Sequence, residues 1–568
     1  MTFPATIKAV QFVGKDQIVI NDAKPLPELQ PHEILLQPEA CGICFSDTKL
    51  LHAFEDHPRK SEVVSVSVCP ESASHKSFDP TVDEAELLAE VAAIPSYKPN
   101  MSATVPGHEP VARIVAVGSA VERHEVGERV LVQTDYRHLP TARSNAAFGY
   151  NFEGALQEYV IVDERVVIDP MSGERFLIPV SDEPTASQVA LIEPWACVEA
   201  AYAWGERQVI ETDGRTLVVA DPGHLVAGLL EILGDSQPDV VQLLGEPGEL
   251  AGYEGLVQLG AKHEVEGDFS DIIYFGADPD QIEWLGSILA PKGILNVVTG
   301  GVEISRDVSV DVGRVHYDLI RFIGTNGHLA SEAYKRIPEL CELKEGDKVA
   351  IVGAAGPMGL MHTMRTAVSG VAGVSMDAVD VDDARLAHLA EAVGPFAAKN
   401  GVPATFRNSK TEPLEPGYDY VSLMVPAPVL LSQAIGLAGD NAVVNAFAGF
   451  AVGTQAEVDY NAIAARGVYL CGTSGSRIQD MKTMLAKVEA GVLDTNVSLW
   501  AVTGFAGFQD AINAVIDRTS GGKIMVYPSV PELGLTPLDK LAETLPEVAA
   551  KLDNGRWTKA AEQALLGR

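Results

Sequence analysis

The order of apolar and polar positions divides the chain into two parts. Short runs with β-strand character occur at residues 7–12, 33–38, 112–117 and 129–132, separated by Gly, Pro and acidic turns. Such runs are typical of strands in a mainly β region. Residues 52–104 interrupt this region with a polar segment that holds one helical pattern, at 83–93. We interpret that segment as an insertion or a lid.

After about residue 205, apolar strand-like runs alternate with helical patterns. This alternation predicts βαβ units and a parallel sheet. One series begins at 216–220 and a second at 348–353. The predicted fold class is therefore α/β plus β: a β-rich domain followed by two tandem doubly wound parallel sheets.

The two series also match in sequence. An offset of 148 positions relates Asp271 to Asp419, Asp311 to Asp459, Gly324 to Gly472, Thr325 to Thr473, and Gly327 to Gly475. An offset of 149 relates Asn296 to Asn445 and Gly300 to Gly449. Ordered matches in the same element context predict a duplication. We expect domains at 1–204 with the insertion 52–104, 205–335, 336–500, and 501–568, the last a returning segment with a helical tail.

Composition narrows the function classes. The 568 residues carry a formal net charge of −36, which disfavours binding to nucleic acids and anionic membranes. We see no uncharged apolar stretch of transmembrane length and no signal-peptide pattern at the N-terminus. The six scattered cysteines do not form a disulfide framework, so we expect a reducing, cytoplasmic setting. As the partner we expect a small-molecule substrate.

Candidate metal ligands occur at three places in the β-rich region. Cys44 follows a strand-like run, His108 and Glu109 precede another, and Glu193 lies further on. A thiolate, an imidazole and one or two carboxylates suit Zn²⁺ and leave a coordination position open. Each of these residues alone is a weak signal, because buried thiols and structural histidines are common; the combination favours a catalytic zinc.

The motifs resemble those of zinc-dependent medium-chain alcohol and polyol dehydrogenases. Gly-Ile-Cys-Phe-Ser-Asp at 42–47 is similar to that family's zinc-ligand loop, and Pro-Gly-His-Glu-Pro at 106–110 to its second ligand strand. The patterns at 126–132 and 154–159 follow in the family's order, and Glu193-Pro resembles the acidic ligand of the polyol and sugar branch. The resemblance covers residues 5–50, 105–200 and 345–528.

This resemblance implies a GroES-like catalytic domain, one Zn²⁺, and Cys44, His108 and Glu193 or Glu109 as its ligands. Ser46 would pass the substrate proton outward. Lys49 stands where the family often has a histidine that ends the proton relay. The distance along the chain from Cys44 to His108 exceeds the family's usual spacing, and residues 129–160 lack the four cysteines of a structural zinc lobe.

The second series begins with a glycine-rich turn that contains Gly353, Gly356 and Gly359. Such a turn lets a pyrophosphate approach a helix N-terminus. Asp380 ends the next strand, 21 positions after Gly359, where a carboxylate favours NAD(H) over NADP(H). The further candidate cofactor contacts are Pro357, Met358, Arg385, Gly472 and Thr473.

The first series keeps only the middle glycine of this turn, Gly223, and places Asp221 near the expected pyrophosphate. We therefore expect it to keep the fold and bind dinucleotide poorly. From chain order, we expect the second copy to serve the zinc site.

The resulting hypothesis is hydride transfer between NAD(H) and a secondary alcohol such as a polyol, a sugar or a sugar derivative. A redox-neutral epimerase or lyase with tightly bound NAD is one alternative, and a catalytically silent nucleotide-binding scaffold is another. The family usually forms dimers or tetramers, so we also expect a homo-oligomer.

Overall fold

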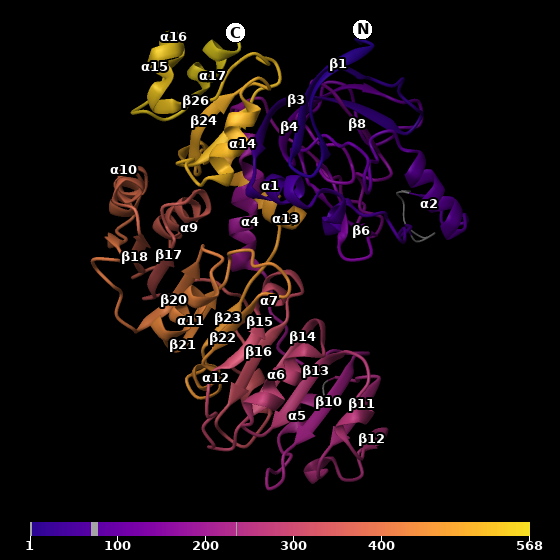
Figure 1. Cartoon of the computed structure of the whole chain (residues 1–568), viewed down its shortest axis with the longest axis vertical. Coiled ribbons are helices and arrows are strands. Elements are labelled where there is room, and N and C mark those ends of the chain that lie inside the picture. The colour runs from indigo at the N-terminus through magenta and orange to yellow at the C-terminus, as the bar shows by residue number, and fades with distance from the viewer. Residues whose placement is uncertain (1–2, 70–77, 235, 568) are drawn as a thin grey trace. The chain divides into compact units, whose positions relative to one another are not determined.

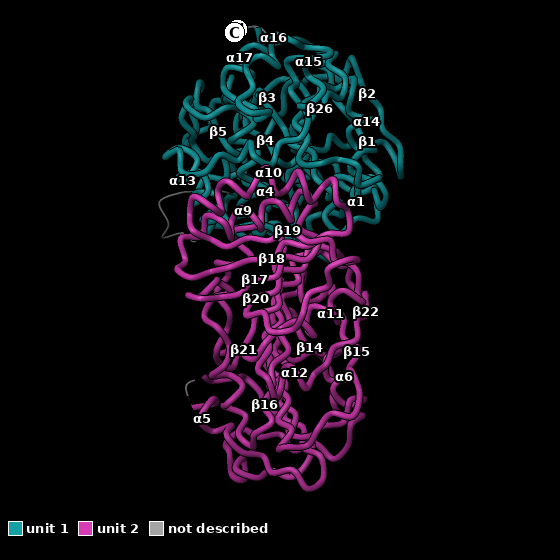
Figure 2. The backbone as a smooth tube through the Cα atoms, turned by 90° about the vertical axis from the view of Figure 1, so that its left-hand side faces the viewer, with its two compact units in different colours: residues 1–197, 475–568 teal, residues 198–474 magenta. Residues whose placement is uncertain are grey.

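The computed structural model describes the whole chain except residues 1–2, 70–77, 235 and 568. The chain forms two compact units (Figure 2): residues 1–197 with 475–568, and residues 198–474. The boundaries differ from those expected at 204 and 500. Residues 475–500, which sequence patterns assign to the second nucleotide domain, cluster with the N-terminal unit.

An eight-stranded sheet organises the first unit, with the order β26-β24-β25-β3-β4-β5-β9 and β8 paired to β3. Two hairpin-like pairs, β1-β2 and β6-β7, accompany it. The strands are β1 (Thr6–Gly14), β2 (Gln17–Pro25), β3 (Glu33–Ile43), β4 (Glu109–Val117), β5 (Arg129–Val132), β6 (Asp135–Pro140), β7 (Asn145–Ala147), β8 (Val160–Asp163), β9 (Leu177–Pro179), β24 (Leu499–Thr503), β25 (Lys523–Val526) and β26 (Thr536–Pro537).

The C-terminal part of the chain completes this sheet. Strand β25 pairs antiparallel with the end of β3, so that Ile524 lies opposite Ile43 and Val526 lies opposite Cys41. Residues from both ends of the chain share one apolar core, in which Phe12 packs near Phe508. The returning segment expected from the sequence thus lies beside the loop that carries Cys44.

Residues 52–104 contain the expected helix, α2 (Glu84–Ala93), which begins where the Asp83 side chain accepts a hydrogen bond from the amide of Glu86. Two short 3₁₀ turns, η1 (Phe54–Asp56) and η2 (Pro58–Lys60), open the segment. An acceptor before the first turn is the usual way to begin a helix.

The second unit contains two parallel six-stranded sheets with the same strand order, β12-β11-β10-β13-β14-β16 and β19-β18-β17-β20-β21-β23. Figure 1 shows α9 and α10 beside β17 and β18 of the second sheet. The strands are β10 (Arg215–Ala220), β11 (Val240–Leu244), β12 (Leu256–Leu259), β13 (Phe269–Phe275), β14 (Leu289–Val298), β16 (Arg321–Thr325), β17 (Lys348–Val352), β18 (Ser375–Asp380), β19 (Ala404–Asn408), β20 (Tyr418–Leu423), β21 (Ala438–Asn445) and β23 (Tyr469–Cys471).

The two sheets also share one apolar core and one strand pair. Strand β15 (Val308–Asp311) runs antiparallel to β22 (Gln455–Val458), with Val308 opposite Val458 and Val310 opposite Ala456. The 148-residue offset makes Ala456 the counterpart of Val308, and Val458 the counterpart of Val310. Val308 therefore faces the counterpart of Val310, and Val310 faces the counterpart of Val308. This exchange is the pattern of a two-fold symmetric contact.

Two glycines near this contact, Gly324 and Gly472, are also related by the 148-residue offset. A Cβ on Gly324 would lie 3.1 Å from the Cβ of Ala464, and one on Gly472 would lie 3.4 Å from the Cα of His316. His316 and Ala464 are themselves 148 positions apart. A side chain would therefore be crowded against the other sheet at Gly324, whereas at Gly472 its Cβ would make an ordinary van der Waals contact with His316.

The remaining helices cover the sheets or form the tail. They are α1 (Phe45–Ala53), α3 (Ala186–Ala190), α4 (Ile192–Ala203), α5 (Leu229–Gly234), α6 (Pro279–Ser287), α7 (Val312–Tyr317), α8 (Ser331–Tyr334), α9 (Pro357–Ala367), α10 (Asp383–Lys399), α11 (Pro428–Leu437), α12 (Tyr460–Ala464), α13 (Ile478–Glu489), α14 (Phe508–Ile516), α15 (Leu541–Thr544), α16 (Pro546–Ala549) and α17 (Lys559–Leu565). Within the described residues, we find no helix with the length and apolarity needed to cross a bilayer.

Candidate functional site

A cluster of three possible metal ligands lies where β3 and β4 meet. The Sγ atom of Cys44, one ring nitrogen of His108 and one carboxylate oxygen of Glu109 lie within 4.8 Å of one another. Antiparallel pairing of Gly42 with Glu109 brings the two ligand segments together. The sequence separates Cys44 from the other two, and the sheet register unites them.

Asp47 holds the first two ligands in place. Its Oδ2 accepts a hydrogen bond from the backbone amide of Cys44 at 2.9 Å, and its Oδ1 lies 3.2 Å from Nδ1 of His108. A carboxylate on one ring nitrogen fixes the imidazole and leaves the other nitrogen for a metal. Burial alone would lower the pKa of His108, but Tyr150 and Asp47 raise it. Asp47 belongs to the motif at 42–47, but the motif alone does not predict this role.

Glu109 is fully buried and is paired with a lysine from the other end of the chain. Its Oε1 accepts from Nζ of Lys523 at 2.6 Å, while its Oε2 has no hydrogen-bond partner among the described residues. A Cβ on Gly42 would lie 2.1 Å from that Oε2, so glycine there leaves room for the carboxylate. Burial would lower the pKa of Lys523, but Glu109 raises it above the ordinary lysine value. Sequence reasoning missed Lys523, because the only signal was its place in the returning segment.

Glu193, in α4, is a buried second carboxylate near the cluster. Burial first, and then the charge of Glu109, raise its pKa to about 7. Its Oε1 accepts a weak hydrogen bond from the thiol of Cys197 at 3.6 Å. Buried carboxylates and thiolates cost free energy when charged unless nearby positive charges compensate them, and Lys523 supplies one such charge to Glu109. This donor set therefore fits a divalent ion such as Zn²⁺.

The beginning of the 52–104 segment reaches the same neighbourhood. The ring of Tyr150 lies 5.3 Å from that of His108 and 5.2 Å from that of His57, measured between centroids. Arg59 lies over Tyr150 and pairs with Asp135 at 2.6 Å. Burial first, and then the charges of Arg59 and Lys49, lower the pKa of His57 to about 3, so it is neutral near pH 7. Sequence analysis did not single out His57 or Arg59.

Ser46 and Lys49 lie in α1, which begins directly after Cys44. The Lys49 ammonium lies 5.7 Å from the centroid of the Phe45 ring. The structure therefore places both residues on the helix that follows the first ligand, and their proposed part in a proton relay stays a prediction.

The glycine-rich turn of the second sheet follows β17 and leads into α9. Gly353 has a φ of +82°, and a Cβ there would lie 2.4 Å from Cγ2 of Val425. A Cβ on Gly359 would lie 2.3 Å from the carbonyl oxygen of Gly353. Both positions therefore require glycine. Gly356 is the N-cap residue of α9, and a Cβ there would lie no closer than 3.9 Å to a neighbouring atom, the carbonyl oxygen of Gly353.

Asp380 ends β18 beside this turn. Its Oδ2 accepts from the amide of Ala355 at 3.1 Å, and its Oδ1 accepts from Arg385 at 2.9 Å. Pro357 and Met358 form the first turn of α9. The structure thus brings seven of the predicted contacts together around one turn: Gly353, Gly356, Pro357, Met358, Gly359, Asp380 and Arg385. Gly472 and Thr473 lie after β23, with Gly472 against the symmetric contact described above.

The matching turn of the first sheet is built differently. The strand registers make Asp221 the counterpart of Gly353, and its carboxylate accepts a hydrogen bond from the hydroxyl of Tyr274. The helix that follows, α5, has six described residues and begins at Leu229, well after the turn. This turn therefore lacks the adjoining helix N-terminus that a pyrophosphate needs.

Comparison with known proteins supports the sequence resemblance. Residues 62–171 match the model of the alcohol dehydrogenase GroES-like domain. The chain is 24% identical to L-sorbose 1-phosphate reductase of Klebsiella pneumoniae over 50% of this chain and 72% of that protein. It is 26% identical to (R,R)-butanediol dehydrogenase of Bacillus subtilis over 44% of this chain and 62% of that protein. The resemblance to alcohol and polyol dehydrogenases is confirmed.

Among solved structures, the chain is similar to 2R,3R-butanediol dehydrogenase from Bacillus subtilis, with 17% identity and a TM-score of 0.49, covering 92% of this chain and all of the other. It is also similar to galactitol-1-phosphate dehydrogenase from Escherichia coli, with 12% identity and a TM-score of 0.48, again over 92% of this chain and all of the other.

Proposed function

We propose that the chain is a zinc-dependent oxidoreductase that transfers hydride between a secondary alcohol and NAD(H). The observation that carries this proposal is the convergence of Cys44, His108 and Glu109 in the unit that contains the alcohol dehydrogenase GroES-like domain. The glycine-rich turn of the second sheet adds a nucleotide site in the same chain.

The zinc would be held by Cys44, His108 and one glutamate, with Glu109 and Glu193 as the candidates. When bound, it would supply Lewis acidity that lowers the pKa of an alcohol hydroxyl. Asp47 would keep the imidazole of His108 oriented. Lys523 would neutralise Glu109 and hold its Oε1, leaving Oε2 toward the cluster. The Ser46 hydroxyl would accept the substrate proton and pass it outward.

NAD(H) would bind the second sheet. Amides at the start of α9 would meet the pyrophosphate, and Asp380 would accept hydrogen bonds from ribose hydroxyls and repel a 2′-phosphate. The pair formed by Asp380 and Arg385 already fixes this carboxylate beside the turn. We therefore favour NAD(H) over NADP(H).

We infer that the two sheets are duplicated Rossmann-type domains, and that the first is a structural partner of the second. The identical strand order, the 148-residue offset and the two-fold symmetric contact support this view. The surface around β15 and β22 is occupied within one chain. A homo-oligomer, which we still expect, has to form through another surface.

For the substrate we favour a polyol, a sugar or a sugar derivative. The named relatives include a sugar-phosphate reductase and a diol dehydrogenase, which supports a substrate with neighbouring hydroxyl groups. The position of Arg59 and His57 near His108 suggests that the 52–104 segment shapes the substrate pocket.

Zinc content and NADH formation test this function together. The wild-type protein should contain about one zinc per chain and form NADH with at least one polyol or sugar and NAD⁺. Cys44→Ala should lose both properties, because it removes a metal ligand. Cys341→Ala, a buried cysteine of the other unit, should keep both and serves as the control. Activity retained in Cys44→Ala would refute the zinc mechanism, and a product formed without net NADH would point to the epimerase alternative.

A further inference from the structure

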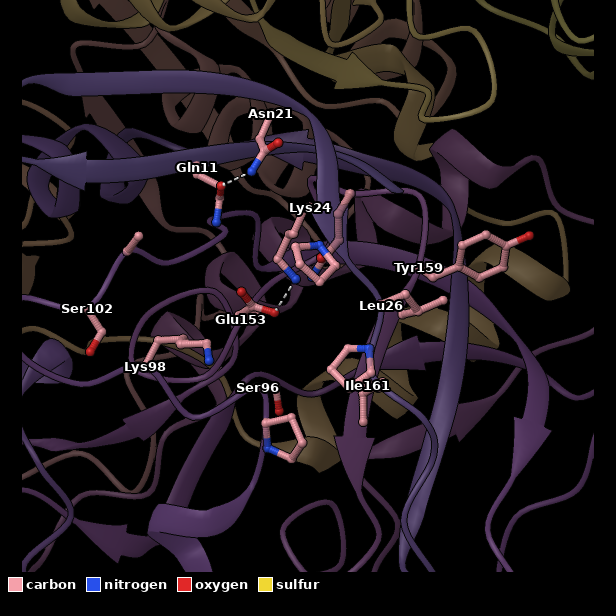
Figure 3. A pocket seen from close by; sticks show the side chains of 15 residues that line it. Gln11, Asn21, Lys24, Leu26, Ser96, Lys98, Ser102, Glu153, Tyr159 and Ile161 are labelled. Carbon is pink, nitrogen blue, oxygen red and sulfur yellow. Dashed lines mark hydrogen bonds and ion pairs between the residues drawn. The ribbon is translucent and has the colours of Figure 1, made fainter. Parts of the chain in front are cut away.

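A cavity lies in the first unit, lined by other residues than those of the candidate metal cluster. Its volume is about 470 Å³, a size suited to a small organic ligand. The walls come from the β1-β2 hairpin, from residues 95–103 and from residues 153–161 (Figure 3). None of Cys44, His108 and Glu109 lines it.

An almost buried ion pair crosses this cavity. Nζ of Lys24 lies 2.9 Å from Oε2 of Glu153, and the two side chains are 12% and 6% exposed. The other carboxylate oxygen of Glu153, Oε1, has no hydrogen-bond partner among the described residues. Lys24 therefore pairs with one carboxylate oxygen of Glu153, and the other oxygen, Oε1, is left as an acceptor.

Two further buried side chains of the wall leave polar atoms unsatisfied. Within the described part of the chain, Oγ of Ser96 and Oε1 of Gln157 have no partner, and both residues are almost fully buried. Gln157 uses its Nε2 to donate to the carbonyl of Gly154, which fixes the amide and leaves Oε1 as an acceptor. A buried polar atom without a partner destabilises the fold, so folded proteins keep few of them.

The unpartnered oxygens of Ser96, Glu153 and Gln157 can all accept a hydrogen bond. The carboxylate oxygen and the amide oxygen can only accept hydrogen bonds, and the serine hydroxyl can accept or donate. From the same segment as Ser96, the Lys98 ammonium is directed toward the cavity, where it can donate (Figure 3). A ligand that complements the cavity therefore presents several groups that both donate and accept.

Hydroxyl groups on a compact carbon skeleton have this property. The remaining wall is mixed: Leu26, Tyr159 and Ile161 offer apolar surface for the C–H faces of such a skeleton, and Gln11, Asn21 and Ser102 add polar groups. We propose that this cavity binds a small polyhydroxylated molecule, a sugar or a polyol, at a site distinct from the metal cluster. This site does not depend on the proposed dehydrogenase activity.

Binding to the Cys44→Ala protein tests the proposal, since that variant removes metal-site binding. Isothermal titration with xylitol, glucose and ribitol should show one site per chain for at least one of them. Serine and glycerol 3-phosphate, as amino-acid and anionic comparators, should bind more weakly. No binding by any of the three polyhydroxylated probes, or tighter binding of a comparator, would overturn the assignment.

Two variants locate the site in the same background. Glu153→Gln should weaken binding by about 10-fold or more, because it removes the charge that strengthens the hydrogen bond from the ligand. Ser96→Ala should weaken binding by a smaller factor and should not unfold the protein, because the hydroxyl it removes has no partner. Thr216→Val removes an equally unpartnered buried hydroxyl outside the cavity and should leave binding unchanged.

Binding that survives both Glu153→Gln and Ser96→Ala would place the ligand elsewhere and refute the site. The proposed dehydrogenase activity is read separately, as NADH formation by the wild-type protein. Failure of one measurement therefore leaves the other interpretable.

Discussion

The two parallel sheets of the second unit have the same strand order but differ at the turn after their first strand. In both sheets an aspartate begins the helix that follows the shared strand pair: Asp311 accepts from the amides of Gly313 and Arg314, and Asp459 accepts from those of Asn461 and Ala462. The folding signals are thus equivalent, down to the capping hydrogen bonds.

The two turns differ in the residues that follow the first strand of each sheet. In the second sheet, Gly353 and Gly359 keep side chains away from the space in front of α9. In the first, Asp221 fills the place of Gly353 and is held by Tyr274. A strand order survives many substitutions that keep the apolar pattern, whereas a phosphate site is lost with a few glycines. The comparison teaches that these two properties are separable in one chain.

The largest effect is expected from a carboxylate in the intact turn. Gly356→Asp should weaken NADH binding by about 100-fold or more, because a negative charge would lie near the pyrophosphate at an effective dielectric constant of about 20. The strand registers make His224 the counterpart of Gly356, so His224→Asp is the matched control and should change nothing. Fluorescence titration with NADH measures both. Equal losses in the two variants would erase the distinction between the sheets.

A smaller effect is expected at the symmetric contact. Gly324→Val and Gly472→Val should each lower the free energy of unfolding by about 2 kcal/mol, since both insert a side chain into a packed contact. Gly436→Ala, in the open part of α11, should be neutral or stabilising. Urea unfolding gives all three values. A loss in only one of the two valine variants would argue against two-fold equivalence.

The acidic residue at the end of the second strand should contribute less. Asp380→Asn should weaken NADH binding about 10-fold and narrow the preference over NADPH, because it removes a charged acceptor for the ribose hydroxyls. The strand registers make the exposed Glu246 the counterpart of Asp380 in the first sheet. Glu246→Gln should leave NADH and NADPH binding unchanged. Unchanged NADH and NADPH affinities in Asp380→Asn would remove the basis for preferring NAD(H).

The smallest difference concerns acid stability. Burial alone would raise the pKa of Asp377, but hydrogen bonds from Thr405 and Tyr418, with the charge of Arg407, lower it. A lowered pKa stabilises the fold above the unfolded value of about 3.8, and this contribution is lost as pH falls through the folded value.

Register makes Leu243 the counterpart of Asp377 in the first sheet, which has no titratable group there. Asp377→Asn should therefore lower the thermal midpoint at pH 7 by about 3 °C or less and have almost no effect at pH 2. Differential scanning calorimetry at the two pH values measures this. An equal loss at both would show that the charge of Asp377 is irrelevant.

Much of the candidate site could be predicted from local sequence. Cys44, His108 and Glu109 stand in short motifs, and Gly353 and Asp380 occupy fixed places around a strand and a helix. The same holds for the helix at 84–93, whose start is marked by Asp83. Lys523, His57 and Arg59 could not be found this way, because each acts through a partner that is distant in the chain and no local pattern marks the pairing.

The sequence by itself predicted which residues bind a metal or a nucleotide, because residue chemistry and glycine placement are local properties. It also predicted two similar parallel sheets, from a constant offset between matching residues that occur in the same order. Only the tertiary structure decided that Asp47 holds His108 and that Lys523 neutralises Glu109. It alone decided that β15 pairs with β22, and that Ser96, Glu153 and Gln157 share one cavity. These pairings depend on sheet register and loop packing, which bring together atoms that no sequence spacing relates.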